Sequence, residues 1–402
     1  MKTRILFVDD EPLVLQGLQR MLRSARHEWE MEFVTSGHEA LSRLENHTYD
    51  VVVSDMRMPG MDGAQLLTEV MRRYPRTARF VLSGHADRDL IMRGLDAIHQ
   101  FMTKPCDLEI LRSTIHRAHA LQETLRTEGL RRLIGQIQQL PSLPKLYHEI
   151  TSLLGQSEVD AAAVGAVVAR DVSMTAKILK LVNSAFFGLG REISSPSEAV
   201  NYLGVETIKA IVLTLHAFAR AGDESVPLSF MDALWSHSLE VAAGSRAITE
   251  AEDAPRRTCD EAFAAGILHD VGKLILRRNF PEEYVECSRI MGSEGLPAWR
   301  AELLVFGASH ADLGGYLLGL WGLPNSVVDA IAFHHTPDKA GRAEFGPLAA
   351  LHVANALLPS RAEGGPSSKT HETLDLDYLQ KTQRADHLPL WNRALGLEST
   401  RP

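Results

Sequence analysis

The 402-residue sequence holds only three cysteines, Cys106, Cys259 and Cys287, and they lie far apart. A disulfide framework or a zinc finger needs more cysteines at closer spacing, so neither is expected. No apolar run approaches the ~20 residues that a membrane-spanning helix requires, so membrane insertion is not expected either. The chain starts directly with a strand pattern and shows no signal peptide. A reducing cytoplasm is therefore the expected location.

An excess of basic charge is also missing, because 42 Lys and Arg residues stand against 51 Asp and Glu residues, for a formal net charge of −9. A globally basic surface for nucleic acid is therefore not expected. The sequence has no recognisable helix-turn-helix with a basic recognition helix, which makes a transcription factor the weakest functional hypothesis. At 402 residues, 45% of them hydrophobic, the chain has the length and composition of two or three globular domains.

Residues 1–120 alternate short apolar runs with stretches of helical spacing. The apolar runs, rich in β-branched residues, are typical of buried strands. The predicted strands lie near residues 5–8, 29–34, 51–53, 80–82 and 101–103. Helical patterns follow them, for example near residues 39–44 and 88–95. Five such units predict an α/β doubly wound, flavodoxin-like domain with a parallel sheet and helices on both faces.

Polar residues follow these strands where each one ends. Asp9 and Asp10 follow the first strand, Asp55 the third, Ser83 the fourth and Lys104 the fifth. Ligands bind at the carboxyl ends of strands in open α/β sheets, so these side chains are expected to converge. Three carboxylates in one pocket need a cation, and Mg²⁺ prefers oxygen ligands. Together with the lysine, such an ion neutralises charge on a transferring phosphoryl group, which makes Asp55 the expected nucleophile.

This constellation, with the acidic pair, DMRMPGMDG, LSG and KP in that order, resembles the receiver domain of bacterial two-component response regulators. The resemblance implies phosphorylation on Asp55 by a sensor histidine kinase and a cis peptide bond before Pro105. The implied Mg²⁺ ligands are Asp9, Asp10 and Asp55. The implied catalytic and switch residues are Asp55 as phosphoacceptor, Lys104, Ser83 and Phe101.

Residues 121–139 form a predicted helical connector between two domains. Leu121, Leu125, Leu130, Leu133 and Ile137 recur at imperfect helical spacing. Two interpretations stay level: a plain linker whose apolar side rests on one domain, or a signalling helix that forms a dimer seam. A homodimer therefore remains an open expectation.

Strand patterns largely vanish after Pro141, and long helical patterns predict an all-α domain over residues 140–360. The turn from Asn183 to Gly188 and the junction at Leu203 and Gly204 resemble the HDOD domain, a helical output module related to the HD superfamily. Residues 361–402 form a predicted tail that opens with a loop rich in Gly, Ser and Pro. The tail has two short helical patterns, and Trp391 is expected to pack it onto the helical domain.

Histidines are concentrated in this second domain. The resemblance to the HD superfamily implies a second, transition-metal site, since these enzymes use such ligands to activate a water molecule. Its implied ligands are His237, His269, Asp270, His310, His334, His335 and Asn355. The sequence departs from the superfamily pattern at two places, and both argue against hydrolytic activity. An amide at Asn355 stands where the superfamily has an aspartate, and no Gly-Tyr-Pro motif follows His335. That motif marks the cyclic di-GMP hydrolases of the superfamily.

The sequence thus predicts a response regulator that accepts a phosphoryl group on Asp55 and relays the signal through an HDOD domain. We expect this output domain to act as a binding or scaffold module for an unidentified downstream protein or nucleotide ligand. The alternative is a phosphorylation-gated, metal-dependent phosphohydrolase that acts on a nucleotide or cyclic nucleotide through the histidine set.

Overall fold

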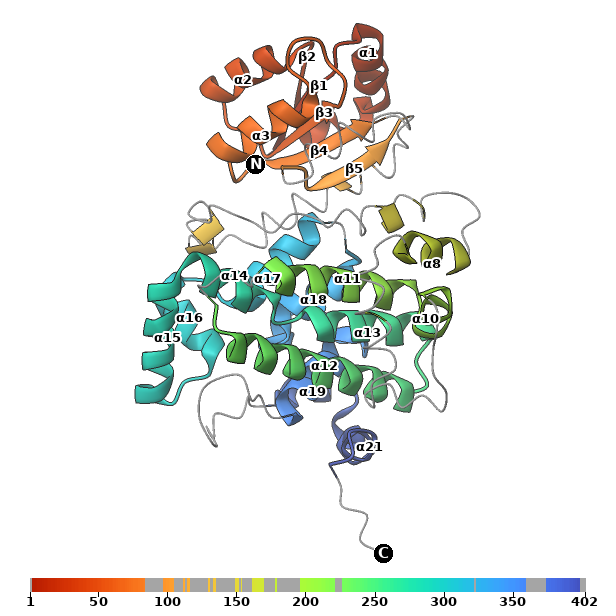
Figure 1. The fold of residues 1–402 in the computed structure, drawn as a ribbon, viewed down its shortest axis with the longest axis vertical. Coiled ribbons are helices and arrows are strands. Elements are labelled where there is room, and N and C mark those ends of the chain that lie inside the picture. The colour runs from red at the N-terminus through yellow and green to blue at the C-terminus, as the bar shows by residue number, and fades with distance from the viewer. Residues whose placement is uncertain are drawn as a thin grey trace, which may run out of the picture. The chain divides into compact units, whose positions relative to one another are not determined.

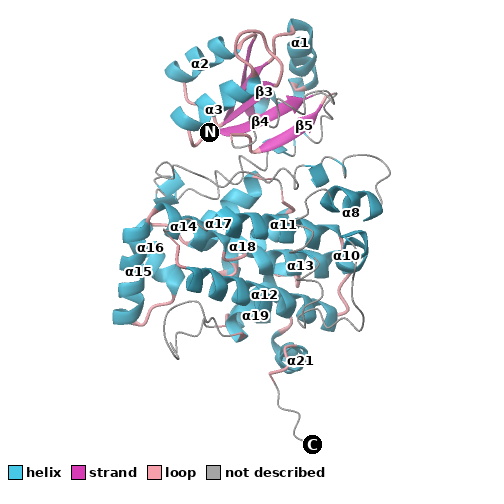
Figure 2. Cartoon of the chain, in the orientation of Figure 1, coloured by secondary structure: helices cyan, strands magenta, loops and turns pink. Residues whose placement is uncertain are grey.

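A computed structural model describes residues 2–83, 97–104, 196–220, 226–321, 323–358 and 374–397, together with residues 161–169 and isolated positions between 111 and 178. The chain divides into two compact units, the first comprising residues 1–145 and 316–322 and the second comprising the rest. All described strands lie in the N-terminal unit, whereas the second unit is helical (Figure 2).

The N-terminal unit is built on a five-stranded parallel sheet in the order β2-β1-β3-β4-β5. Its strands are β1 (Thr3–Val8), β2 (Trp29–Val34), β3 (Val51–Asp55), β4 (Ala78–Ser83) and β5 (Gln100–Thr103). The first three residues of β3, all valine, are essentially inaccessible to solvent. A strand buried on both sides is the expected consequence of a parallel sheet with helices on both faces.

Three α-helices of this unit are described: α1 (Pro12–Met21), α2 (Gly37–Asn46) and α3 (Gly63–Arg73), with a 3₁₀ turn at Arg23–His27 after α1. Helices α2 and α3 lie together on one side of the sheet and α1 on the other (Figure 1). Ser36 caps α2, and Asp62 forms a capping box with Gln65 at the start of α3. These caps satisfy N–H groups that have no partner within the helix, and they fix where each helix begins.

The second unit packs helices around the buried helix α13 (Arg256–Leu268) (Figure 1). Its other α-helices are α8 (Ala161–Ala169), α10 (Pro196–Leu203), α11 (Val205–Arg220), α12 (Leu228–Ala251), α14 (Val271–Asn279), α15 (Pro281–Glu294), α16 (Ala298–Phe306), α17 (His310–Leu320, whose residues from 316 on are grouped with the first unit), α18 (Asn325–Phe333), α19 (Pro347–Leu357), α20 (Leu376–Lys381) and α21 (Leu388–Ala394). Short 3₁₀ turns span Pro337–Ala340 and Ala385–His387.

Gly204 joins α10 to α11 in a left-handed conformation, with φ of +83°. A Cβ at this position would also lie 2.6 Å from Asp260 Oδ2, so only glycine fits the junction without strain. Among the helices that the structure describes, none is alone both long and apolar enough to span a membrane. The bent pair α16 and α17 meets that test by length and composition.

The predicted fold class is confirmed: a flavodoxin-like α/β unit precedes an all-α unit. The two helices predicted in the tail are present as α20 and α21, and Trp391 is completely buried as expected. The helix predicted near residues 88–95, most of the connector at 121–139 and the turn at residues 183–188 lie outside the described residues.

Candidate functional sites

Two carboxylates and an amine meet at the carboxyl edge of the sheet. Asp9 follows β1 and Asp55 ends β3, and these strands are parallel neighbours. Both side chains are almost fully buried, with exposed fractions of 3% and 9%. Lys104, after β5, places Nζ 2.7 Å from Asp9 Oδ2 and in contact with Asp55 Oδ1. We call Asp9, Asp55 and Lys104 the carboxylate pocket.

Backbone amides hold both carboxylates in place. The N–H of Glu11 donates to Asp9 Oδ1 at 2.9 Å, and the N–H of Arg57 donates to Asp55 Oδ2 at 2.8 Å. Burial raises the pKa of Asp55, although the hydrogen bond and charge of Lys104 oppose this shift. Burial alone would lower the pKa of Lys104, but its hydrogen bonds to Asp55 and Asp9 prevail and raise it. The amine therefore stays protonated between the two acids.

Gly63 brings the start of α3 against the backbone of the pocket. A Cβ on Gly63 would lie 2.2 Å from the carbonyl oxygen of Asp55, closer than any real contact. The N–H of Gly63 also donates to the carbonyl of Met56 at 3.0 Å. The end of the loop after β3 therefore packs directly on the end of the strand, and this contact fixes the backbone that carries the Asp55 side chain.

The other residues predicted for this site are described in part. Asp10 follows Asp9 and is partly buried. Ser83 ends β4, and Phe101 in β5 pairs with Val81, but the side chains of Ser83 and Phe101 lie outside the described part of the chain. Pro105 also lies outside it, so the predicted cis peptide bond stays a prediction.

The histidines predicted for the second site converge from four places in the helical unit. His237 lies in α12, His269 and Asp270 join α13 to α14, His310 begins α17, and His334 and His335 follow α18. Within each of two groups, every residue offers an atom within 4.8 Å of the others. The groups are His237, His269 and Asp270, and His310, His334 and His335. We call these six residues the histidine cluster.

Three of these imidazoles are anchored through one ring nitrogen and leave the other without a hydrogen-bond partner. His269 Nδ1 donates to Gly266 O at 2.6 Å, and His334 Nδ1 donates to Ile331 O at 2.7 Å. His237 Nε2 lies 3.0 Å from Asn355 Oδ1. The second nitrogen of each ring, His269 Nε2, His334 Nε2 and His237 Nδ1, is buried without a hydrogen bond. A carbonyl acceptor on one nitrogen leaves a lone pair on the other, which is the form that binds metal.

Asp270 links the two groups of the cluster. Its carboxylate lies 3.1 Å from His310 Nε2, 3.4 Å from His269 Nε2 and 3.1 Å from Lys273 Nζ. The Nε2 atoms of His310 and His335 are 2.9 Å apart. Two ring nitrogens at this distance need a proton or another cation between them.

Burial and neighbouring charges shift the pKa values in opposite directions. Burial lowers the pKa of His237 to about 4, and burial with neighbouring imidazoles holds the pKa values of His334 and His335 well below the usual range. Burial would also lower the pKa of His310, but Glu302 and Asp270 raise it to about 9. Burial opposes ionisation of Asp270, yet His269 and Lys273 keep its pKa well below the ordinary value. Most of the cluster therefore presents neutral imidazoles around one anionic carboxylate.

Sequence reasoning missed three residues that support this cluster. Glu302 Oε2 accepts bonds from both His310 N and His310 Nδ1 at 2.7 Å. Lys273 pairs with Asp270, and its i,i+3 spacing on one helix was a usable signal. His352 Nδ1 bonds to the carbonyl of His334, and nothing in the sequence pattern indicated this contact. Asn355 directs its carbonyl at His237, so in this structure it orients a histidine.

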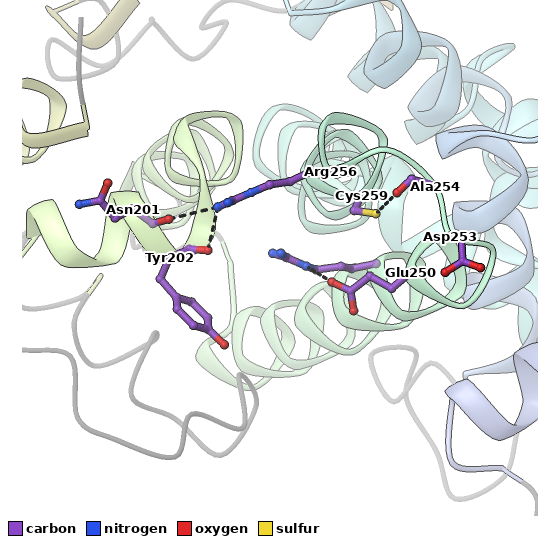
Figure 3. Close-up of a pocket in the computed structure, with 8 residues that line it drawn as sticks. Asn201, Tyr202, Glu250, Asp253, Ala254, Arg256 and Cys259 are labelled. Atoms are coloured by element: carbon purple, nitrogen blue, oxygen red, sulfur yellow. Dashed lines mark hydrogen bonds and ion pairs between the residues drawn. The ribbon is translucent and has the colours of Figure 1, made fainter.

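A pocket of about 570 Å³ lies elsewhere on the helical unit, between α10, the end of α12 and the start of α13 (Figure 3). Arg256 donates to the carbonyls of Asn201 and Tyr202 at 3.1 and 3.3 Å, and Arg246 donates to Glu250 at 2.8 Å. Its arginines are thus engaged by the protein itself, Arg256 by satisfying carbonyls at the end of α10. The pocket contains none of the site residues predicted from the sequence.

Comparison with known proteins identifies both units. The response regulator receiver domain family matches residues 5–116, and the HDOD domain family matches residues 140–337. A solved HDOD domain protein of unknown function from Geobacter sulfurreducens is 25% identical with a TM-score of 0.52, covering 68% of this chain and 90% of its own.

Two curated relatives match over a smaller share of their own length. An uncharacterized protein of Treponema pallidum is 25% identical over 248 residues, which is 60% of this chain and 46% of the relative. The uncharacterized transcriptional regulatory protein YesN of Bacillus subtilis is 27% identical over 191 residues, which is 40% of this chain and 50% of the relative. The chain thus spans half or less of the length of these two relatives.

Proposed function

Since this chain is a response regulator in which a receiver domain precedes an HDOD output domain, we propose that Asp55 accepts a phosphoryl group from a sensor histidine kinase. The observation that carries this proposal is the contact of one protonated amine, Lys104, with both Asp9 and Asp55. An oxygen of Asp55 forms the new P–O bond while the P–N bond to the donor histidine breaks. The electron pair returns to the imidazole, which takes up a proton.

The residues of the carboxylate pocket fit a hard cation, because two buried carboxylates and Asp10 offer oxygen ligands. Asp9, Asp10 and Asp55 would hold Mg²⁺, which supplies positive charge that offsets the phosphoryl oxygens. Lys104 provides a second, fixed positive charge, and the N–H groups of Glu11 and Arg57 keep the carboxylates oriented. The signal then passes through Ser83 and Phe101 to the output domain.

Acetyl phosphate labelling of the full-length protein tests this assignment. Asp55→Asn removes the nucleophile while keeping the shape of the side chain, so we expect labelling to disappear. Glu45→Gln, an exposed acid of the same unit, is the matched control and should label like the wild type. Undiminished labelling of Asp55→Asn would refute the assignment.

For the output domain we propose a binding or scaffold role that involves the histidine cluster, with a downstream protein or nucleotide ligand as the partner. The cluster is largely buried, and two of its imidazoles, His269 and His334, are fixed by bonds to backbone carbonyls, which suits retention of a ligand. The cluster residues and Asn355 would hold a transition metal, which supplies Lewis acidity when bound. The three buried nitrogens without hydrogen bonds are the observation that supports metal binding.

The same observation favours a second candidate, a phosphohydrolase gated by phosphorylation that acts on a nucleotide or cyclic nucleotide. Here Asp270 would hold a proton or a water molecule at the cluster, and Lys273 would supply positive charge beside a phosphate. The amide at Asn355, in place of a carboxylate, favours the binding role over turnover.

Metal analysis of the full-length protein, purified without chelator, separates these functions. Bound transition metal with phosphate release from nucleotides, lost in Asp270→Ala, supports the phosphohydrolase. Bound metal without turnover supports the binding role. A metal-free, folded protein would refute metal binding at the cluster, and the histidines would then form a structural network.

A further inference from the structure

The C-terminal segment, residues 374–397, is clamped to the helical unit by a single carboxylate. Glu252, at the end of α12, has a side chain only 5% exposed. It accepts from Arg384 Nε at 2.9 Å and Trp391 Nε1 at 2.9 Å, and it lies 2.5 Å from His387 Nδ1. Three residues of the segment therefore converge on one buried anion, and this anchors the segment at a defined place.

Apolar contacts fix the same segment. Leu379 and Trp391 have no exposed surface, and Phe345 stacks on Trp391 with ring centroids 6.0 Å apart. Leu395 reaches α12 so closely that a Cβ on Gly244 would lie 2.9 Å from it. The C-terminal segment is thus part of the packed unit, and moving it would expose core side chains.

His352 connects this segment to the histidine cluster. The backbone N–H of Asp375 donates to His352 Nε2 at 2.9 Å, so this nitrogen carries the lone pair. The proton of the neutral ring must then reside on Nδ1, which donates to the carbonyl of His334 at 2.7 Å. One N–H of the C-terminal segment therefore sets the tautomer of a ring that bonds to a cluster residue.

The carbonyl of His334 belongs to the peptide bond that joins His334 to His335. A bond to this carbonyl fixes the plane of the peptide and so the direction in which both imidazoles leave the backbone. His334 has its other anchor at Ile331 O, and His335 meets His310 through Nε2. His334 and His335 are therefore held both by His352, which contacts the C-terminal segment, and by contacts within the cluster.

We infer that His352 is a positioning residue that couples docking of the C-terminal segment to the geometry of His334 and His335. Docking of the segment holds the two imidazoles in the arrangement that binds a ligand. By reciprocity, a ligand at the cluster tightens the segment. The geometric coupling stands on the contacts above, whereas the ligand part rests on the metal binding proposed for the cluster.

Two substitutions of His352 separate its bonds. The amide nitrogen of His352→Asn falls near Nδ1 and keeps the bond to His334 O, but does not reach Asp375. The amide oxygen of His352→Gln falls near Nε2 and keeps the bond from Asp375. Imidazole ¹⁵N signals of His334 and His335 report the cluster, and hydrogen exchange of residues 374–397 reports docking, both in the full-length protein.

We expect His352→Asn to loosen the segment with near-native imidazole signals, and His352→Gln to shift those signals with the segment docked. His352→Leu should change both. A folded His352→Leu protein with unchanged signals for His334 and His335 would overturn the inference, because the ring would then be only a packing element.

Perturbation from the far end provides the second test. Glu252→Gln weakens the clamp, so we expect faster exchange in residues 374–397, shifted His334 and His335 signals and about tenfold weaker Zn²⁺ binding. Glu250→Gln, an exposed acid on the same helix, is the matched control. A loosened segment with unchanged imidazole signals would contradict the coupling. Absence of Zn²⁺ binding in the wild type would refute the proposed metal function, while the imidazole signals still decide the coupling.

Discussion

In the carboxylate pocket the chain provides its own counter-charge, since Lys104 contacts both Asp9 and Asp55. In the histidine cluster, by contrast, three ring nitrogens face inward with no hydrogen-bond partner among the described residues. The first site is charged and lies at the edge of a sheet. The second is made largely of neutral groups and lies among buried helix ends.

For the ions proposed above, this difference predicts two modes of binding. An ion in the carboxylate pocket shares its ligands with an ammonium group already in place, which suits weak, exchangeable binding. In the cluster Lys273 also pairs with Asp270, but the imidazoles are oriented beforehand by carbonyl and carboxylate partners, which favours tighter binding of the proposed metal ion. On the functions proposed above, the first site exchanges its occupant and the second retains it.

The largest expected effect is the loss of Zn²⁺ affinity when the carboxylate of the histidine cluster is removed. Among the described residues, Asp270 is the carboxylate that belongs to one ligand group and also contacts the other, through His310. Asp270→Asn should therefore weaken binding of Zn²⁺ by at least about 100-fold. Competition with a chromophoric chelator measures the affinity. Asp232→Asn, an exposed position on α12, is the control. Equal zinc affinity in Asp270→Asn and the wild type would place the metal elsewhere.

A pair of glycine substitutions sharpens the comparison. At each site a glycine packs closely against the backbone of one site residue. Gly63 meets the carbonyl of Asp55, and a Cβ on Gly272 would lie 2.1 Å from the carbonyl of His310. Either change to alanine should cost about 2 kcal/mol of unfolding free energy. Gly63→Ala should slow acetyl phosphate labelling about tenfold and leave the affinity for Zn²⁺ unchanged. Gly272→Ala should weaken Zn²⁺ binding about tenfold and leave the labelling rate unchanged.

Gly17→Ala and Gly292→Ala are the controls for this pair, since a Cβ at either helical position would meet nothing within 4 Å beyond the backbone of its own helix. Each should stabilise the protein by up to about 1 kcal/mol. If either Gly63→Ala or Gly272→Ala reduced both the labelling rate and the affinity for Zn²⁺, the two sites would not be independent.

A smaller effect tests the built-in counter-charge. Lys104→Met leaves Asp9 and Asp55 facing each other, and we expect the unfolding free energy to fall by about 1–2 kcal/mol, less than for a fully buried pair. Mg²⁺ should restore more of the melting temperature in this variant than in the wild type, because the ion replaces the lost charge. Calorimetry with and without Mg²⁺ measures this, with Lys2→Met, an exposed lysine, as the control. An equal Mg²⁺ response in both proteins would contradict the idea.

The sheet and the residues at its edge were predictable because short apolar runs, and the positions where they end, are local properties of the sequence. The position of Asp55 after three valines already implies a parallel-sheet edge next to Asp9. The cluster residues could be named only through the resemblance to a family, since no spacing relates His237 to His334.

The supporting residues were beyond sequence reasoning. Glu302 precedes His310 by eight positions and reaches it only because α16 and α17 meet at a sharp bend. His352 acts through a backbone carbonyl, and Asp375 through a backbone N–H, so neither contact depends on a recognisable side-chain pattern. Contacts of this kind follow from tertiary packing alone.

The clamp at Glu252 also bears on how the protein is made. The five strands of the sheet lie within the first 104 residues, so the ribosome delivers them early. Glu252 can contact Trp391 only after a further 139 residues have been synthesised. The contacts of Glu252 with the C-terminal segment can therefore form only late in translation, long after all five strands of the sheet have been synthesised.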